Sequence, residues 1–206
     1  MYVPEFNRIK DKAAVVAFMR EHPFAILVSN SDGAPFATHI PVLASERGDQ
    51  VVLTGHVAKA NPHWKLLQQD QEALIIFHGP HAYISPSLYA SRESVPTWNY
   101  AAVHVYGRAT VFSEAARLRE ILIEMLQVFD TPYLDQWDGL REEYRSGMLK
   151  HIVGFEIAVD RLEGKFKLSQ NRSRQDQANI IQSLQEGEES AVREIARLMK
   201  QQGLGS

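Results

Sequence analysis

Short apolar segments joined by tight turns, near the start of the chain, constrain its fold most. Phe24 to Ser29 and Phe36 to Leu43 are two such segments, and the turn residues Ser31-Asp32-Gly33 lie between them. A second turn at Glu46 to Asp49 leads into a third segment, Val51 to Gly55. Strands that follow one another through short turns pair antiparallel, because parallel neighbours need a long crossover. The sequence therefore predicts an antiparallel meander of three strands.

The rest of the chain adds strands in runs and inserts helices between them. Further strands are expected at Ala73–Phe77, Ala82–Ser85, Trp98–Phe112 and Ile152–Val159. Helical spacing predicts helices after Asp11, Asn61 and Ser113, over Gln136–Met148, and twice near the C-terminus. Strands that come in runs, rather than alternating with helices, indicate an α+β protein or a barrel with helical additions. We expect the α+β class with mainly antiparallel β structure.

The charge balance and the missing cysteines exclude several function classes. The chain has 206 residues, no cysteine and a formal net charge of -3. Thiolate catalysis, disulfides, iron–sulfur clusters and cysteine-bound zinc are excluded, and non-specific coating of nucleic acid is disfavoured. The N-terminus lacks a signal-peptide pattern, and no apolar run is long enough to span a membrane. We therefore expect a cytoplasmic protein that does not bind a membrane.

A first candidate binding segment is Gly55 to Pro62, where a strand end is expected to lead into a helix. Unpaired backbone N–H groups at such a junction favour an anion, and His56, Lys59 and Asn61 add polar side chains beside them. Asn61 is also a good helix cap, and Lys59 is equally explained as a solvated side chain. The segment is therefore either a phosphate site or the start of a capped helix.

A second candidate lies at the start of an expected strand and consists of Thr97, Trp98, Asn99 and Tyr100. Its two rings offer stacking surface for a planar heterocycle, and its two polar side chains can bind the edges of that heterocycle. An aromatic stripe on a strand also packs readily in a core. Both alternatives stay open at the level of the sequence.

A third candidate is the basic segment Gly164 to Arg172. In an extended backbone Lys165, Lys167 and Ser169 point to one side. Two ammonium groups on one face suit a phosphate or an acidic partner, although a solvated strand face has the same pattern. Positive charge gathers here, because Arg161 to Arg174 holds five basic residues and one acidic residue.

The sequence gives no sign of a metal site or of a known catalytic motif. Phosphate-loop, dinucleotide-binding, zinc-protease and hydrolase motifs are all missing. Three pairs of histidines are possible metal ligands: His78 with His81, His56 with His63, and His39 with His104. None has the spacing and companion carboxylates of a known site, so we expect no metal. The catalytic residues, if there are any, stay unknown.

Seven segments, spread in order over most of the chain, carry a resemblance to a known family. They are Met1–Pro4, Pro23–Ala25, Ala37–Pro41, Gly55–Pro62, Phe77–Pro86, Pro96–Tyr100 and Lys165–Asn171. The chain resembles the PaiB family, whose usual description is FMN-binding negative transcriptional regulator. Lys59 stands where many members are expected to have arginine, so the positive charge is kept but a bidentate grip on phosphate is not.

The resemblance implies a split β-barrel of the FMN-binding type with inserted helices and a C-terminal helical extension. Residues 1–160 would form the FMN-binding barrel, and residues 161–206 would supply the basic segment and the C-terminal helices that pack on it. Such proteins are usually homodimers with the flavin near the subunit interface. The implied cofactor is therefore FMN, and the implied partner is a second copy of the chain.

The resemblance also implies where FMN is bound. The phosphate is expected near His56 to Asn61, the isoalloxazine ring near the second candidate segment, and the basic segment is expected to close the site from either subunit. The implied cofactor-binding residues are Thr38, His39, His56, Lys59, Asn61, Thr97, Trp98, Asn99, Tyr100, Lys165, Lys167, Ser169, Gln170 and Asn171.

Three functions are compatible with these residues. The family description implies a negative transcriptional regulator that acts directly or indirectly, although the faintly acidic chain shows no helix-turn-helix pattern and supports DNA only weakly as a partner. The alternative is a flavin-dependent oxidoreductase with a small substrate, in which His39 or Tyr83 lies near the flavin ring. A flavin-free, partner-binding protein is the third.

Overall fold

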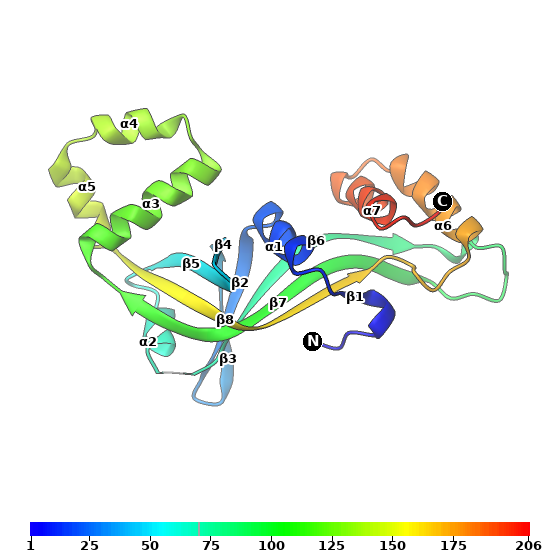
Figure 1. Ribbon diagram of the computed structural model, residues 1–206, viewed down its shortest axis with the longest axis horizontal. Helices are drawn as coiled ribbons and strands as arrows, with labels where there is room; N and C mark the ends of the chain where they lie inside the picture. Colours follow the sequence, from blue (N-terminus) through cyan, green and yellow to red (C-terminus); the bar gives the residue numbers. More distant parts are fainter. Residues whose placement is uncertain (70) are drawn as a thin grey trace. The chain divides into compact units, whose positions relative to one another are not determined.

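An open antiparallel sheet of eight strands runs through the computed structural model, which describes residues 1–69 and 71–206. The strands lie in the order β3-β2-β6-β7-β8-β5-β4, and β1 pairs with β8 (Figure 1). Their bounds are β1 (Arg8–Ile9), β2 (Phe24–Ser31), β3 (Ala34–Pro41), β4 (Leu43–Arg47), β5 (Gln50–Ala58), β6 (Ala73–Ile84), β7 (Thr97–Phe112) and β8 (Ile152–Lys167). The antiparallel pairing of β2 with β3 and of β4 with β5 confirms the predicted strand connections.

Helices are inserted between the strands and follow the last of them. They are α1 (Lys12–Glu21), α2 (His63–Leu67), α3 (Ala115–Phe129), α4 (Tyr133–Gly139), α5 (Glu142–Leu149), α6 (Arg174–Gln185) and α7 (Ser190–Gln201), with short 3-10 helices at Glu5–Asn7 and Pro86–Leu88. Asp11 caps the start of α1, because its side chain accepts a hydrogen bond from the backbone N–H of Ala13 at 2.9 Å. None of the described helices is long and apolar enough to cross a membrane.

The described residues fall into two structural units. The terminal unit comprises Met1–Phe18, His78–Val103 and Glu163–Ser206, and the hairpin unit comprises Met19–Phe77 and His104–Leu162. The long strands β6, β7 and β8 contribute residues to both units. Each unit is described by itself below.

The hairpin unit contains two antiparallel hairpins, β2–β3 and β4–β5, and the predicted meander of three strands is wrong, because β3 and β4 lie at opposite ends of the strand order. Strands β2 and β3 meet at a turn in which Asp32 has a φ angle of 53° and Gly33 one of 84°. The strand expected over Phe36 to Leu43 ends at Pro41, because the strand is broken at Val42. The backbone N–H of Val42 donates to the carbonyl oxygen of Pro23 at 2.8 Å, which ends β3 before β4 begins.

Helices α3, α4 and α5 belong to the same unit and follow β7 in the chain (Figure 1). Leu118, Ile121 and Met125 of α3 are buried in one cluster with Phe112 and Leu149. The single helix expected over Gln136–Met148 is instead two, because the extended backbone at Leu140 and Arg141 separates α4 from α5. An apolar stripe at helical spacing therefore predicted the packing face of α3 correctly.

The terminal unit contains the two predicted C-terminal helices, which lie side by side (Figure 1). Ser173 caps α6 by accepting a hydrogen bond from the backbone N–H of Asp176 at 3.1 Å. In α7 the apolar face is fully buried, since Ile195, Ala196 and Met199 are all 0% exposed. The boundary expected between residues 160 and 161 stays a prediction.

The two strands expected at Ala73–Phe77 and Ala82–Ser85 form one continuous strand, β6. Gly79 and Pro80 lie between the two expected strands, but the structure includes both in β6 and buries both. Strand β8 likewise continues past the expected end at Val159 as far as Lys167, so the basic segment is extended up to that residue.

Candidate functional site: a lysine pair beside exposed aromatic rings

Two lysines lie near the end of β8 in the terminal unit. Lys165 is 7% exposed, and its ammonium lies 5.1 Å from the centre of the Tyr100 ring. Lys167 donates to the backbone carbonyl oxygen of Trp98 at 2.9 Å and to the hydroxyl of Thr97. The structure therefore brings together five of the residues that the sequence proposed for cofactor binding.

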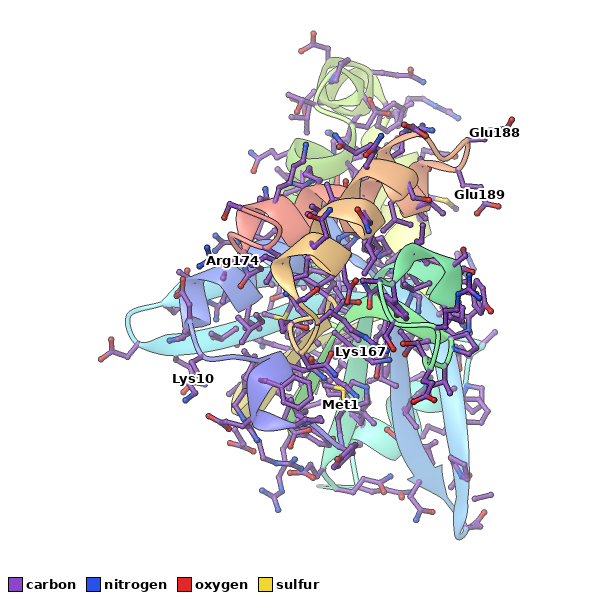
Figure 2. The ribbon with its side chains drawn as sticks, turned by 90° about the vertical axis from the view of Figure 1, so that its right-hand side faces the viewer. Met1, Lys10, Lys167, Arg174, Glu188 and Glu189 are labelled. Atoms are coloured by element: carbon purple, nitrogen blue, oxygen red, sulfur yellow. The ribbon has the colours of Figure 1, made fainter. Side chains whose placement is uncertain are left out.

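This lysine pair has no acidic partner. In the described part of the chain no carboxylate forms an ion pair with Lys165 or Lys167. Burial, and then the charge of Lys165, lower the pKa of Lys167. Glu188 and Glu189 lie well away from Lys167 (Figure 2). Two partly desolvated like charges are unfavourable until an anion joins them, so these residues fit a phosphate group.

Trp98 belongs to an exposed aromatic surface in the same unit. Its ring centre lies 5.9 Å from that of His81 and 5.8 Å from that of Tyr83. Trp98 and Tyr83 are each 52% exposed, so their rings are not core residues. Half-exposed rings provide a stacking surface for a planar heterocycle. The bond from Lys167 to the Trp98 carbonyl joins this surface to the lysine pair.

Asn99 and Ser169 contribute to the packing of the C-terminal helices. Asn99 is 0% exposed, accepts a hydrogen bond from the Ser169 hydroxyl at 3.0 Å and donates to the sulfur of Met199 at 3.8 Å. The expectation that Ser169 points with Lys165 and Lys167 is wrong. The extended backbone ends at Lys167, and the φ angle of 63° at Ser169 turns this side chain towards buried Asn99.

The last two predicted residues of the basic segment differ in their surroundings. Gln170 closes the turn after β8, because its side chain accepts from the backbone N–H of Leu168 at 2.7 Å and donates to the carbonyl oxygen of Phe166. Asn171 is exposed, and its side chain has no partner within residues 1–69 and 71–206. Of the two, Asn171 is the one whose polar groups are free to meet a ligand.

In the hairpin unit a buried histidine binds two of the predicted residues. His63 is 0% exposed, with Nδ1 at 2.8 Å from the Thr38 hydroxyl and Nε2 at 3.1 Å from the Ser29 hydroxyl. Asn61 donates to the Thr38 oxygen at 3.1 Å and accepts from the backbone N–H of His63 at 3.0 Å. Burial lowers the pKa of His63 to about 4. The polar groups of Thr38 and Asn61 are thus engaged within the protein, as the capped-helix alternative requires.

The junction expected after Gly55 is wrong, because β5 continues to Ala58 and pairs there with Ile152 of β8. His56 therefore lies inside a strand and not at a strand end. Burial lowers its pKa, and its buried Nδ1 has no hydrogen-bond partner in the described residues. Helix α2 begins only at His63. The backbone N–H groups expected to hold an anion are thus not grouped around His56.

His39 and Lys59, the other predicted contacts of the hairpin unit, are both exposed. The ring centre of His39 lies 6.4 Å from that of Phe24. The backbone of Lys59 is bonded to the carbonyl oxygen of His151 at 2.7 Å, while its side chain has no partner among the residues that the structure describes. The Lys59 ammonium is therefore exposed to solvent.

Two residues of these surroundings were not proposed as cofactor contacts from the sequence. The sequence suggests His63 only as a metal ligand in a pair with His56, because its partners Ser29 and Thr38 lie far away in the chain. His81 was considered only as a metal ligand. The alternation of exposed residues along β6 could have placed it beside Tyr83.

Solved structures define the class of fold. The flavocytochrome Anf3 from Azotobacter vinelandii matches with a TM-score of 0.63 and 19% identity, over 80% of this chain and 72% of that one. The FAD and heme binding protein from Mycobacterium smegmatis matches with a TM-score of 0.61 and 16% identity, over 78% of this chain and 73% of that one. The fold is therefore that of the flavin-binding split-barrel proteins, here with an open sheet, which confirms the predicted fold class.

Sequence comparison gives the family. Residues 1–161 match the family described as "Putative FMN-binding domain", and the chain belongs to this family. It is 40% identical over 204 residues to "Protease synthase and sporulation protein PAI 2" of Bacillus subtilis (strain 168), covering 97% of each chain. It is also 30% identical over 245 residues to an uncharacterized protein of Emericella nidulans, covering 98% of each. The resemblance to the PaiB family is confirmed, and so is FMN as the cofactor of the family.

Proposed function

We propose that this protein is a PaiB-type flavoprotein in which Lys165 and Lys167 bind the phosphate of FMN and Trp98 stacks on its isoalloxazine ring. The observation that carries the proposal is the lysine pair without an acidic partner in the described residues. A phosphate dianion supplies the missing counter-charge, and hydrogen bonds between charged groups are among the stronger ones in proteins. The half-exposed indole beside Lys167 suits the ring of the same ligand.

Tyr100 and Thr97 have supporting roles in this proposal. The Tyr100 ring lies against the Lys165 ammonium and holds it without neutralising it. The Thr97 hydroxyl and the Trp98 carbonyl both accept hydrogen bonds from Lys167 and fix the direction of its ammonium. When bound, FMN would supply the redox chemistry that a chain without cysteine lacks. The other predicted contacts, His39 and His56 among them, stay predictions, whereas this proposal gives Lys59 no part in binding the phosphate.

The experiment that tests FMN binding is a titration of the purified, flavin-free protein with FMN and with riboflavin. The expected result is saturable binding of both, with FMN bound more tightly because only FMN carries a phosphate. Equal affinity for the two would exclude the lysine pair as a phosphate site. Absence of saturable binding to either flavin would exclude the flavoprotein and leave the flavin-free alternative.

The biological role under this proposal is negative control of transcription by a cytoplasmic homodimer that binds the flavin near its subunit interface. The support is the similarity to the sporulation protein of Bacillus subtilis and the family description that this similarity implies. An electrophoretic shift assay at rising salt tests direct repression. Sequence-specific binding that persists at moderate salt supports it, whereas weak binding equal for all sequences shows that regulation is indirect. Sedimentation of the protein with and without FMN tests the homodimer.

A flavin-dependent oxidoreductase is the second candidate, and the position of Tyr83 favours it. This phenol is half exposed and its ring lies 5.8 Å from that of Trp98, so it could donate a proton to a substrate beside the flavin. An enzyme would be supported if the FMN-loaded protein oxidised reduced nicotinamide faster than free FMN does. The variant Tyr83→Phe should then lower this rate. A rate equal to that of free FMN over a panel of small substrates would contradict it.

A further inference from the structure

Strand β6 contains a local irregularity that brings two histidines together. Along β6 buried and less buried residues alternate, but Gly79 and Pro80 are buried one after the other. His78 and His81, which flank them, are both exposed. Residues three apart in a regular strand point to opposite faces, so the shift of one residue, as in a β-bulge, puts both imidazoles on the same face.

The residues around Gly79 hold this irregularity in place. A Cβ atom at Gly79 would lie 2.5 Å from Cζ of Phe18 and 3.3 Å from the carbonyl oxygen of Ala101, so the backbone is pressed against the core. Pro80 has no backbone N–H for a ladder hydrogen bond, which is typical of proline at a bulge. The rings of His78 and His81 lie 5.3 Å apart, at an interplanar angle of 66°.

Both imidazoles are available to a ligand. In residues 1–69 and 71–206 neither ring has a hydrogen-bond partner or an ion pair, so their nitrogen atoms face solvent. A neutral imidazole is the form that coordinates a metal ion.

We propose that His78 and His81 form a two-imidazole site for a divalent late transition-metal ion on the exposed face of β6. Among the described residues no third histidine or carboxylate joins the pair, so the remaining coordination positions are left to water. Two imidazoles and water suit Cu²⁺ best, followed by Ni²⁺ and Zn²⁺.

The site is separate in its chemistry from the proposed flavin site, because it takes a cation by nitrogen ligands and not an anion by ammonium groups. The ring centre of His81 is nevertheless only 5.9 Å from that of Trp98. Cu²⁺ quenches the fluorescence of a nearby indole, so Trp98 reports on binding at the pair. Trp98→Phe removes this signal and separates it from the signals of the other two tryptophans of the chain.

The test is a titration of the full, tag-free chain with Cu²⁺ alone, followed by fluorescence and by electron paramagnetic resonance. We expect saturable binding of one ion per chain and a spectrum with coupling to two imidazole nitrogens. His78→Ala and His81→Ala should each weaken binding at least about tenfold, since loss of even an indirect partner of a metal ligand costs that much. His151→Ala, which removes an exposed histidine of the hairpin unit, is the matched control and should change nothing.

Two outcomes would overturn the proposal. One is Cu²⁺ binding of equal affinity in the original chain and in the double variant His78→Ala/His81→Ala, with both shown to be folded by thermal unfolding. The other is coupling to a single nitrogen that survives in the double variant. The variant Lys165→Ala/Lys167→Ala should still bind Cu²⁺ after it has lost its preference for FMN. The proposed flavin site and the metal site can therefore fail independently.

Discussion

The ammonium of Lys167 donates a hydrogen bond to the backbone carbonyl oxygen of Trp98 at 2.9 Å, across two neighbouring strands. This bond holds a cation against the backbone of a residue whose indole is half exposed. A nucleotide such as FMN has an anionic end and a planar end, and the two residues match these ends separately. Variants of each residue should therefore affect different flavins in different ways.

Removal of the lysine pair should weaken the binding of FMN and leave the binding of riboflavin unchanged. The double variant Lys165→Ala/Lys167→Ala loses only groups proposed to meet the phosphate, and a hydrogen bond to a charged group contributes about 1.5–3 kcal/mol. FMN affinity should therefore fall about tenfold or more. Fluorescence titration with both flavins measures this, with the exposed lysines of Lys150→Ala/Lys200→Ala as the control.

Lys59→Ala distinguishes the two lysine positions that the sequence suggested for the phosphate. The Lys59 side chain is exposed and the lysine pair is partly buried, so we expect this variant to bind FMN like the original chain. If Lys59→Ala lowered the affinity for FMN but not the affinity for riboflavin, the phosphate would bind at Lys59 and not at the lysine pair.

Trp98→Ala should weaken the binding of FMN and of riboflavin equally, because both carry the isoalloxazine ring. The loss should be about 0.5–1.5 kcal/mol, the usual contribution of an aromatic pair. Tyr144→Ala is the control, since Tyr144 is 50% exposed on α5 and outside the proposed site. A weaker affinity for FMN alone would show that Trp98 acts through Lys167 and not by stacking.

The buried His63 predicts a pH dependence of stability. A neutral ring with its proton on Nε2 satisfies both partners, because Nδ1 then accepts from the Thr38 hydroxyl and Nε2 donates to the Ser29 hydroxyl. The folded pKa is lowered from 6.5 to about 4, so below pH 6.5 the unfolded chain binds more protons than the folded one. The free energy of unfolding should therefore fall as pH falls through this window, by about 3 kcal/mol in total.

Urea unfolding at several pH values between about 7 and 4 measures this contribution. His63→Gln should be less stable at neutral pH, and its stability should depend less on pH in this window. His39→Gln, a change at an exposed ring, should keep the full dependence. If the free energy of unfolding depended on pH equally in His63→Gln and in the original chain, His63 would not be the group that titrates.

Gly79→Ala should destabilise the protein. The new methyl group would lie 2.5 Å from the ring of Phe18, which is itself buried at 3% exposure and packed 5.1 Å from Phe166. Overpacking of this kind costs about 1–3 kcal/mol. Gly147→Ala in α5 is the matched control, because nothing lies within 4 Å of its new methyl group, and it should stabilise the helix by up to about 1 kcal/mol. Thermal unfolding of both variants measures whether each substitution lowers or raises the stability of the protein.

Local signals in the sequence were sufficient for the tight turns but not for the long strands. Asp32 and Gly33 can adopt positive φ angles, so the turn between β2 and β3 could be predicted. Gly79 and Pro80 lie between two strands that the sequence predicts separately, yet they belong to one continuous strand, β6. Their position depends on Phe18 and on backbone packing from β7, and neither can be read from the residues around Gly79.

In the candidate site, too, local sequence patterns predict some features, while contacts between distant residues determine the others. Alternation along an extended backbone correctly put Lys165 and Lys167 on one face. It failed at Ser169, because the left-handed conformation there is held by hydrogen bonds with Asn99 and with Gln177 of α6, whose side chain donates to the Ser169 carbonyl oxygen at 3.2 Å. Such bonds link residues far apart in the chain, so no local pattern reveals them.

Strand β8 pairs with β5 over Ile152 to Ala158 and with β1 at Gly164 and Lys165. Because side chains alternate along a strand, one residue added or removed between these two pairings would exchange the faces of Lys167 and Phe166. The lysine pair would then enter the core while the phenyl ring became exposed. Relatives of this protein should therefore vary in amino-acid type along β8 but keep its length, and natural insertions should fall in the connections on either side of it.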